Sequence, residues 1–360
     1  MGKYQYSQPD EEYHKKQLIV ENYRSTFNSN YNHLLPYVQV LAIYKDISQP
    51  QTPSHVTISL PVCNQVEIIA NVLTVLLKNC EIASNLVIIL DACRDDSKAE
   101  VIQVIENFDL KSSVTKIIIL ESKEDLFEST CENIALKLFD SNYFLSLQAD
   151  IYYIDSTFLT RGIAFFEKYP DLLGVSGRAI IPASNRKPDI CRKYLNKGFN
   201  IITALFARIT KQKFLSPFYS NSLYFGDLST PPHSKMRYSR KQLTTVYIGD
   251  SIIRGPVIWR SSYLKKLGLF SDHKYFLGGD EREMSVQGFD LFNYKVGFLP
   301  TTCFTNLWTG TSHNPQKRTK ETLQILDGRK ELQQLNGGNF LHELKRIDNI
   351  ENSKGSLYRL

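Results

Sequence analysis

The sequence predicts an α/β protein whose mostly parallel β-sheet is covered by helices on both faces. Short, almost wholly apolar segments alternate along the chain with segments whose apolar residues recur at helical spacing. Strands that are apolar throughout are typical of parallel sheets buried on both sides. The chain has 360 residues, 42% hydrophobic and 22% charged, which is the length and composition of a globular protein with a sizeable core.

The regular alternation begins after Pro53. Residues 56–60 are rich in β-branched side chains and stop at Pro61, which indicates a strand. The next segment has apolar residues three and four apart, which indicates a helix, and the pattern continues to a fourth strand. The strands expected in this half cover residues 56–60, 86–90, 114–120 and 143–147, and the helices cover 67–79, 99–108 and 129–140.

Regularity decreases in the second half of the chain. We expect a helix over 157–169 and a strand within 171–183, and a turn at 254–256 leads into a short strand and a helix over 261–267. Residues 185–247 are an insertion rich in aromatic and basic side chains. Two interpretations of this insertion stay open. It is either a helical insertion with an aromatic core or an acceptor-binding lid whose aromatic faces stack on sugar rings.

The two ends of the chain flank the segments in which strands and helices alternate. Residues 1–54 read as an N-terminal extension that closes with a linker at 48–54, and residues 311–360 as a C-terminal helical tail that frays at its end. The polar N-terminus argues against a signal peptide, and no run of about 18 apolar residues predicts a transmembrane helix. The six cysteines form no CxxC pair, so reduced thiols in a cytoplasmic protein are expected. The net charge of +6 is mild and gives no reason to expect a nucleic-acid partner.

Polar and acidic residues follow three of the expected strands. Residues 61–65 follow the first strand, residues 91–97 the second and residues 148–150 the fourth. Because ligands of open parallel sheets bind beyond the carboxyl ends of the strands, we expect these three segments to line one binding site. Within the second segment, Asp96 and Ser97 are candidate caps of the following helix, and capping is the favoured role for Ser97.

No GxGxxG or GxxxxGKS/T motif follows any strand, so a Rossmann dinucleotide site and a P-loop are both disfavoured. Phosphates then need another neutralising group, and Mg²⁺ or Mn²⁺ held by a strand-end carboxylate would serve. Asp150 is placed to be that ligand, although a turn or N-cap role would also explain a single acid. Asp91, at the tip of an apolar strand, could accept a hydrogen bond from a nucleotide base.

Asp280 and Glu281 come directly after Gly278 and Gly279, at the expected start of a helix. Acids in a first helical turn are stabilised by the helix dipole, so they could serve structure alone. Acids held at a glycine hinge can also act as a general base. Both interpretations stay open at this point.

These motifs occur in an order that resembles the family 2 glycosyltransferases, which have the GT-A fold. The resemblance spans residues 55–310, with a nucleotide-binding half at 55–155 and an acceptor half at 156–310. Each motif is weak alone, and their order and spacing together are more specific. The matching segments are Ser59-Leu60-Pro61-Val62-Cys63-Asn64, Ile89 to Ser97, Asn133 in the third helix, Gln148-Ala149-Asp150 at the DxD position, Arg254-Gly255-Pro256, and Gly279-Asp280-Glu281 with Glu283 and Met284.

The resemblance implies a role for each matching residue. Asp150 would bind a Mn²⁺ or Mg²⁺ ion that bridges the two phosphates, and His313 could be a further metal ligand or a surface histidine. Either Asp280 or Glu281 would be the catalytic base, with Glu281 at the family's usual base position. The residues expected to bind the nucleotide sugar are Pro61, Cys63, Asn64, Asp91, Arg94, Asn133, Gln148, Ala149 and Arg254.

Three residues depart from the family pattern. Arg94 replaces a small polar residue and Gln65 a frequent acid, and Gln148 replaces the first acid of the metal motif. A glutamine at that position can still hydrogen-bond a ribose hydroxyl. The substitution weakens the metal assignment because one carboxylate fewer is offered.

The function expected from the resemblance is transfer of a sugar from a nucleotide-diphosphate sugar to an acceptor hydroxyl, with inversion and with a metal. Arg254 would help to neutralise the leaving diphosphate. The acceptor would be a glycan, a lipid-linked molecule or a protein. Two alternatives stay open. A nucleotidyltransferase would use the same strand-end acids, and a catalytically silent member would only bind the nucleotide sugar.

Overall fold

The structure is a computed structural model of the whole chain, and it describes eleven segments of it. These are residues 38–44, 55–108, 113–123, 126–177, 179–180, 224–225, 244–249, 251–252, 254–270, 280–305 and 357–360. His313 and most of the 185–247 insertion lie outside these residues, as does the greater part of both chain ends.

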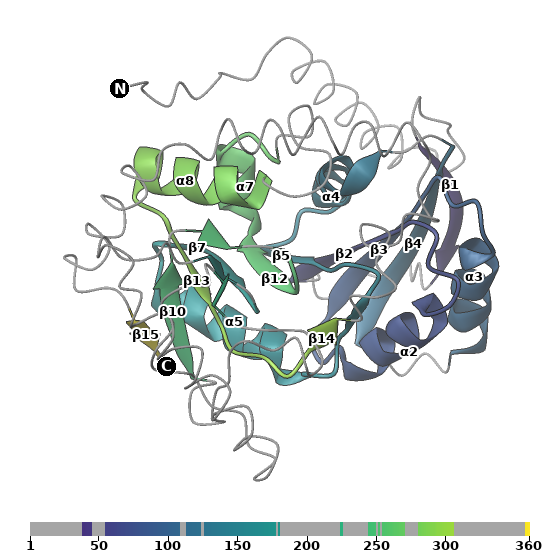
Figure 1. Ribbon diagram of the computed structural model, residues 1–360, viewed down its shortest axis with the longest axis horizontal. Coiled ribbons are helices and arrows are strands. Elements are labelled where there is room, and N and C mark those ends of the chain that lie inside the picture. Colours follow the sequence, from purple (N-terminus) through teal and green to yellow (C-terminus); the bar gives the residue numbers. More distant parts are fainter. Residues whose placement is uncertain are drawn as a thin grey trace, which may run out of the picture.

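A ten-stranded sheet runs through the molecule, in the order β1-β4-β3-β2-β5-β12-β7-β13-β10-β15 (Figure 1). In chain order its strands are β1 (Val38–Tyr44), β2 (Val56–Val62), β3 (Ser84–Asp91), β4 (Val114–Ser122), β5 (Tyr143–Ser146), β7 (Leu172–Ser176), β10 (Thr245–Gly249), β12 (Val257–Arg260), β13 (Lys295–Phe298) and β15 (Leu357–Arg359). Short strands form two further sheets: β6 (Ile151–Tyr152) with β14 (Phe304–Thr305), and β8 (Ala179–Ile180) with β9 (Tyr224–Phe225) and β11 (Ser251–Ile252).

The strand directions confirm the expected mostly parallel sheet. Strands β4, β3, β2 and β5 pair in parallel, and β7 and β13 run in the same direction beyond them. Strand β12 lies between β5 and β7 and is antiparallel to both. Strands β2, β3, β4 and β5 were predicted from the sequence to within a few residues. The strand expected within 171–183 instead divides into β7, in the main sheet, and β8, in a small one.

Both described ends of the chain add strands to the sheet, which differs from the sequence prediction. Residues 38–44, expected to belong to an extension, form β1 and pair antiparallel with β4. Residues 357–359, expected to belong to a helical tail, form β15 and pair antiparallel with β10. In each case a segment that is distant in the sequence pairs with a strand of the sheet. It supplies hydrogen-bond partners for backbone groups of that strand that would otherwise be unpaired.

Helices cover both faces of the sheet, as expected. They are α2 (Ile69–Asn79), α3 (Ser97–Asn107), α4 (Phe127–Leu138), α5 (Thr157–Lys168), α7 (Ser261–Lys266) and α8 (Asp280–Phe292). Helices α2, α3 and α5 contribute to one buried apolar cluster, and α4, α7 and α8 to a second one across the sheet. The longest described helix, α8, has 13 residues, and no described helix has the length and apolar character needed to cross a membrane.

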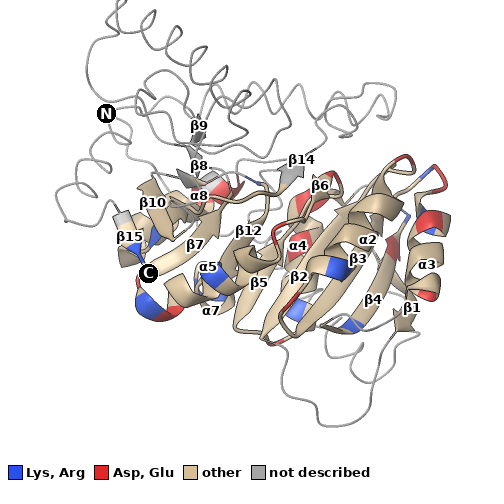
Figure 2. Ribbon diagram, turned by 90° about the horizontal axis from the view of Figure 1, so that it is seen from below, with Lys and Arg blue, Asp and Glu red and all other residues tan. Residues whose placement is uncertain are grey.

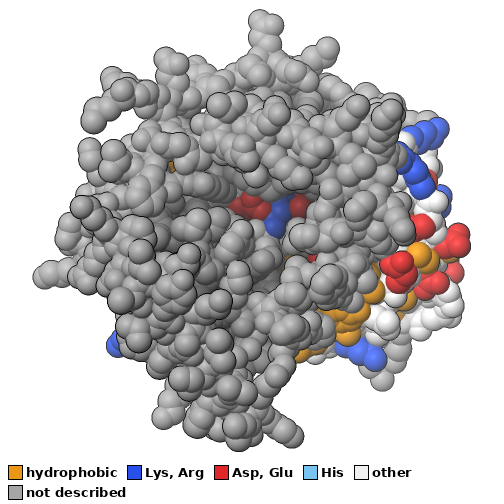
Figure 3. Space-filling view, viewed as in Figure 1, with side chains coloured by type: hydrophobic (Ala, Val, Ile, Leu, Met, Phe, Trp, Pro, Cys, Tyr) orange, Lys and Arg blue, Asp and Glu red, His pale blue; other side chains and the backbone are white. Residues whose placement is uncertain are grey.

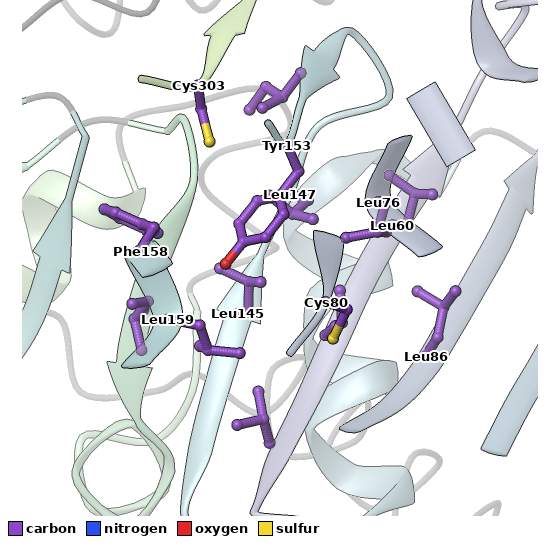
Figure 4. Close-up of a cluster of buried hydrophobic side chains, with 14 of the residues drawn as sticks. Leu60, Leu76, Cys80, Leu86, Leu145, Leu147, Tyr153, Phe158, Leu159 and Cys303 are labelled. Carbon is purple, nitrogen blue, oxygen red and sulfur yellow. The ribbon is translucent and has the colours of Figure 1, made fainter. Parts of the chain in front are cut away.

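The first cluster packs leucines and aromatic rings between the sheet and α2, α3 and α5 (Figure 4). Leu60 and Leu86 on neighbouring strands are 0% exposed, as is Phe158 on α5. Complete burial of a side chain of this size stabilises the fold by roughly 1.5–3 kcal/mol. Because the strands are buried on both faces, this half of the sheet is a rigid platform whose carboxyl edge can position polar groups.

Candidate functional site

Arg254 lies at the centre of a buried group of acids. Its side chain is 5% exposed, and its three nitrogens all face protein oxygens. Nε is 2.7 Å from Glu281 Oε1. Nη1 is 2.9 Å from Glu132 Oε2 and 3.1 Å from Glu128 Oε1. Nη2 donates to Asp280 Oδ2 and to Ser129 Oγ, the latter at 3.2 Å. We call Arg254, Glu128, Glu132, Asp280 and Glu281 the arginine–acid cluster.

The fold explains why these residues meet. Helix α4 follows β4 and α8 precedes β13, so both helices begin at the carboxyl edge of the parallel strands. Strand β12 runs antiparallel to β5, so the segment before it, with Arg254, reaches the same edge. Figure 2 shows acidic residues on both α4 and α8. In Figure 3 acidic and basic side chains are visible together near the centre of the view.

Serine hydroxyls complete the arginine–acid cluster. Ser129 Oγ donates to Asp280 Oδ2 at 2.8 Å, and Ser146 at the end of β5 hydrogen-bonds Glu132. The backbone N–H of Arg254 donates to Glu281 Oε1 at 3.1 Å. The cluster therefore joins β5, α4, α8 and the segment before β12 through side chains that are remote in sequence.

The arginine–acid cluster must retain protons at neutral pH. Four ionised carboxylates and one guanidinium would sum to a net charge of −3, on side chains that are at most 12% exposed. Burying so much uncompensated charge is prohibitively unfavourable. Burial raises the pKa of Glu128, and it raises the pKa of Glu132 and Glu281 well above the usual range even though Arg254 opposes it.

Asp280 is the exception among the four acids. Burial alone would raise its pKa, but Arg254, Glu281 and Ser129 together lower it. The carboxylate of Asp280 in turn raises the pKa of Glu281. The pKa values of two adjacent carboxyl groups are thus shifted in opposite directions, because Arg254 and Ser129 favour the charged form of Asp280 while burial and the charge of Asp280 disfavour that of Glu281.

Asp91 ends β3 and binds the start of α4. Its carboxylate accepts hydrogen bonds from the backbone N–H groups of Leu126 at 2.7 Å and Phe127 at 3.0 Å. A carboxylate at this position satisfies N–H groups that have no partner within the helix and favours the helix dipole. Asp91 therefore holds α4, with Glu128 and Glu132, against the carboxyl edge of the sheet.

The loops after β2 and β3 are tied to each other. Asn64, which has a positive φ of 51°, accepts a hydrogen bond from the N–H of Arg94 at 2.7 Å. Ser97 Oγ accepts from the N–H of Gln65 at 2.7 Å, so this serine joins the two loops. Ser97 is the first residue of α3 rather than its N-cap, and its N–H donates to Asp95 Oδ1 at 3.0 Å. The N-cap position is Asp96, whose side chain makes no capping hydrogen bond. Asn64 and Arg94 thus lie together, and Cys63 and Pro61 in the same segment are half-buried. Contact between these residues and a nucleotide sugar stays a prediction.

Gln148, Ala149 and Asp150 form the turn after β5. Gln148 and Asp150 are half-buried, whereas Ala149 is buried. Gln148 Nε2 donates to Glu128 Oε2 at 3.4 Å, and the pKa of Glu128 is raised chiefly by burial, with a smaller contribution from the charge of Asp150. The turn therefore lies beside the arginine–acid cluster, and the predicted metal ligand and predicted base face one region of the molecule.

The donor set fits only one of the modes in which proteins hold a divalent cation. Among the described residues no three His, Cys, Asp or Glu side chains come together as metal ligands. Asp150 could hold Mg²⁺ or Mn²⁺ in the mode that uses one or two carboxylates together with substrate phosphates. His313, the other predicted ligand, lies outside the described residues.

Asn133 is placed differently from the other predicted binding residues. Its side-chain amide donates to the carbonyl of Phe270 at 2.8 Å and accepts from the N–H of Phe270 at 3.0 Å. The side chain is buried, and both ends of the amide are used to attach α4 to the segment after α7. These contacts show a structural task, and contact between Asn133 and a nucleotide sugar stays a prediction.

Glu128, Ser129 and Glu132 were not predicted from the sequence. Residues three and four apart share one face of a helix, so Glu128 and Glu132 point to the same side of α4. The available signal was this pair of acids on a helix that also carries buried apolar residues. Acids at this spacing are common on solvated helix faces. Only the position of Arg254 in the folded chain shows that this pair is buried around a cation instead.

The fold is an α/β arrangement with a mostly parallel sheet, as the sequence predicted. No family model and no curated protein sequence matches the chain. Among solved structures it is similar to a mannosyltransferase from Pyrobaculum calidifontis in complex with GDP-Man and Mn²⁺, with 12% identity over 82% of this chain and 66% of that one and a TM-score of 0.42. It is also similar to S. aureus TarS, with 12% identity over 70% of this chain and 60% of that one and a TM-score of 0.40. A third similar structure is glucosyl-3-phosphoglycerate synthase from Mycobacterium tuberculosis, with 10% identity over 75% of both chains and a TM-score of 0.38.

Proposed function

We propose that this protein transfers a sugar from a nucleotide-diphosphate sugar to an acceptor hydroxyl, with inversion at the anomeric carbon and with the help of a divalent metal. One observation carries the proposal. The strand-end turn with Asp150 and the acid pair Asp280–Glu281 flank a single acid, Glu128, although 130 positions separate Asp150 from Asp280 in the sequence. Donor binding and proton removal would then occur in one place.

The nucleotide would lie over the loops after β2 and β3. Asn64 and Arg94 lie together there, and Asp91 is the last residue of β3 at the same edge. Each oxygen of a carboxylate offers two acceptor directions, so Asp91 can hold α4 and still accept from a base. The diphosphate would extend from these loops toward Asp150.

Asp150 would hold the metal. When bound, Mg²⁺ or Mn²⁺ neutralises charge that develops on a leaving diphosphate. The chain's own contribution is to aim Asp150 from a turn fixed by β5 and to keep Gln148 beside it, where its amide oxygen remains available to a ribose hydroxyl.

The pair Asp280–Glu281 would supply the base, as one carboxylate of the two. The acceptor O–H would give its proton to this carboxylate as the oxygen attacks the anomeric carbon from the face opposite the diphosphate. Attack from that face forms the new C–O bond as the old one breaks, which inverts the configuration. We place Arg254 as the counter-charge of these acids rather than of the diphosphate, because its nitrogens face protein carboxylates.

The test uses the purified full chain with UDP-linked and GDP-linked hexoses that carry the label in the sugar, with Mn²⁺ or with a chelator. We expect release or transfer of labelled sugar that depends on Mn²⁺ and is abolished in Asp150→Ala. Asp280→Asn should reduce turnover about 10²–10⁴-fold, the usual contribution of a general base. The exposed acid Glu106 provides a matched control, Glu106→Gln, whose turnover should equal that of the natural chain.

The same assay separates the alternatives. Transfer of an α-phosphate label from a nucleoside triphosphate, with no movement of sugar label, would identify a nucleotidyltransferase. Binding of the nucleotide sugar without any turnover, unaffected by Asp280→Asn, would identify a silent binding protein. Either result would overturn the proposed function.

A further inference from the structure

Glu128 differs from the other acids around Arg254 in its exposure. Its side chain is 12% exposed, whereas those of Glu132, Asp280 and Glu281 are 1%, 0% and 5% exposed. Gln148 and Asp150 beside it are also half-buried. Of the four acids, Glu128 is therefore the one that a bound molecule can reach with the least rearrangement.

The contacts of Glu128 place it between the two functional parts of the site. On one side its Oε1 is 3.1 Å from Arg254 Nη1, which belongs to the same guanidinium that binds Asp280. On the other side its Oε2 is 3.4 Å from Gln148 Nε2, and the charge of Asp150 acts on it. Glu128 thus links the turn that carries the predicted metal ligand to the acids that carry the predicted base.

In the proposed reaction the transferred sugar lies between Asp150 and the acid pair Asp280–Glu281. Its anomeric carbon is bonded to the diphosphate on one face and attacked by the deprotonated acceptor on the other. A side chain that contacts both the Asp150 turn and the guanidinium holding Asp280 must therefore flank the sugar ring. A carboxyl group is suited to that position, because it accepts hydrogen bonds from hydroxyl groups through both oxygens.

We propose that Glu128 binds hydroxyl groups of the sugar being transferred and so contributes to the choice of donor sugar. This inference rests on the proposed function, since it needs a sugar donor at the site. It adds a residue that does not belong to any of the motifs by which the chain resembles its family.

The experiment compares binding of a sugar nucleotide with binding of its sugar-free diphosphate. Calorimetric titrations in Mn²⁺ use UDP-glucose against UDP, and GDP-mannose against GDP, on the natural chain, Glu128→Ala, Glu128→Gln and the control Glu106→Gln. In Glu128→Ala we expect the affinity for the sugar nucleotide to fall about tenfold or more, the effect of a lost hydrogen bond to a charged group, with affinity for the free diphosphate unchanged.

Glu128→Gln keeps the size of the side chain and an amide oxygen for Arg254, so it tests the same point in a chain that is closer to the natural one. It should lose less affinity than Glu128→Ala, again for the sugar nucleotide alone. Equal losses for sugar nucleotide and free diphosphate, or no loss for either, would overturn the inference. If the natural chain binds none of the four compounds, the proposed function fails first, which is a different result.

Discussion

The two halves of the main sheet are held together in different ways. Strands β4, β3, β2 and β5 run in parallel and bury apolar side chains on both faces, with Ile58, Leu60, Ile88 and Ile119 at 0% exposure. Beyond β5 the directions are mixed, and the carboxyl edge is joined to α4 and α8 through Arg254 and four acids. Dispersion and the hydrophobic effect dominate the stability of the first half. The second half also contains buried charges, and the charge of each acid depends on Arg254 and on the other acids.

The two halves differ in how their contribution to stability responds to pH. Apolar packing does not change with pH, so the parallel half can be a constant support. The arginine–acid cluster changes its charge with pH and with the loss of any member, which is the behaviour required of groups that move a proton. The following predictions begin with the largest expected effect.

Replacing Arg254 by methionine should have the largest effect, because it leaves four buried acids without their counter-charge. Breaking a buried ion pair by removing one partner costs about 3–5 kcal/mol. We expect a loss of that size in the free energy of unfolding at pH 7, measured by urea denaturation, and a smaller loss at pH 5, where the acids are protonated more readily. The exposed Arg94 gives the control Arg94→Ala, and an Arg254→Met chain as stable as that control would contradict the idea.

In the parallel half, Leu60→Ala should cost about 2–5 kcal/mol by leaving a cavity beneath α2. This loss should be the same at pH 5 and pH 8, since no titratable group is involved. Leu291, which is 57% exposed, supplies the control Leu291→Ala, expected to change stability by at most about 0.5 kcal/mol. A pH-dependent loss in Leu60→Ala would remove the distinction between the two halves.

Glu132→Gln should reduce the dependence of stability on pH. The pKa of Glu132 in the folded chain is raised well above the value of about 4.3 expected when unfolded. The folded state then binds the proton more tightly, so this contribution is fully present below the unfolded pKa and is lost as pH rises through the folded pKa. Its size is about 1.4 kcal/mol for each unit by which the two pKa values differ.

Glutamine cannot lose this proton, so unfolding free energies of Glu132→Gln measured from pH 4 to pH 9 should fall less steeply than those of the natural chain. Glu106→Gln, on the surface, should retain the natural slope. An unchanged slope in Glu132→Gln would mean that Glu132 is ionised throughout this range.

Asp91→Ala should have the smallest effect, about 1 kcal/mol, because it removes the acceptor for the first N–H groups of α4. The matched control is Asp96→Ala, since Asp96 precedes α3 without a capping hydrogen bond from its side chain. Thermal unfolding of the two variants compares them directly. Equal melting temperatures would show that the contacts of Asp91 with α4 contribute nothing measurable.

The parallel half was predictable because its information is local. Continuous apolar runs such as 86–90 read as buried strands, and the helical spacing of Ile69, Val72 and Leu76 defines α2 without knowledge of any partner. The convergence of residues 61–65, 91–97 and 148–150 then follows from one general rule about the carboxyl ends of parallel strands. Asp280 and Glu281 were found as an acid pair at the start of a helix, which is also a local feature.

Only the tertiary structure decided which acids surround Arg254. Nothing local distinguishes Glu128 and Glu132 from solvated helix acids. Their pKa values depend on burial and on Arg254, which lies 122 and more positions further along the chain. The strands β1 and β15 were missed for the same reason, since each is stabilised by pairing with a distant strand rather than by its own pattern. Periodicity is a property of neighbouring residues, whereas electrostatic coupling and edge pairing depend on distances that the folded chain alone sets.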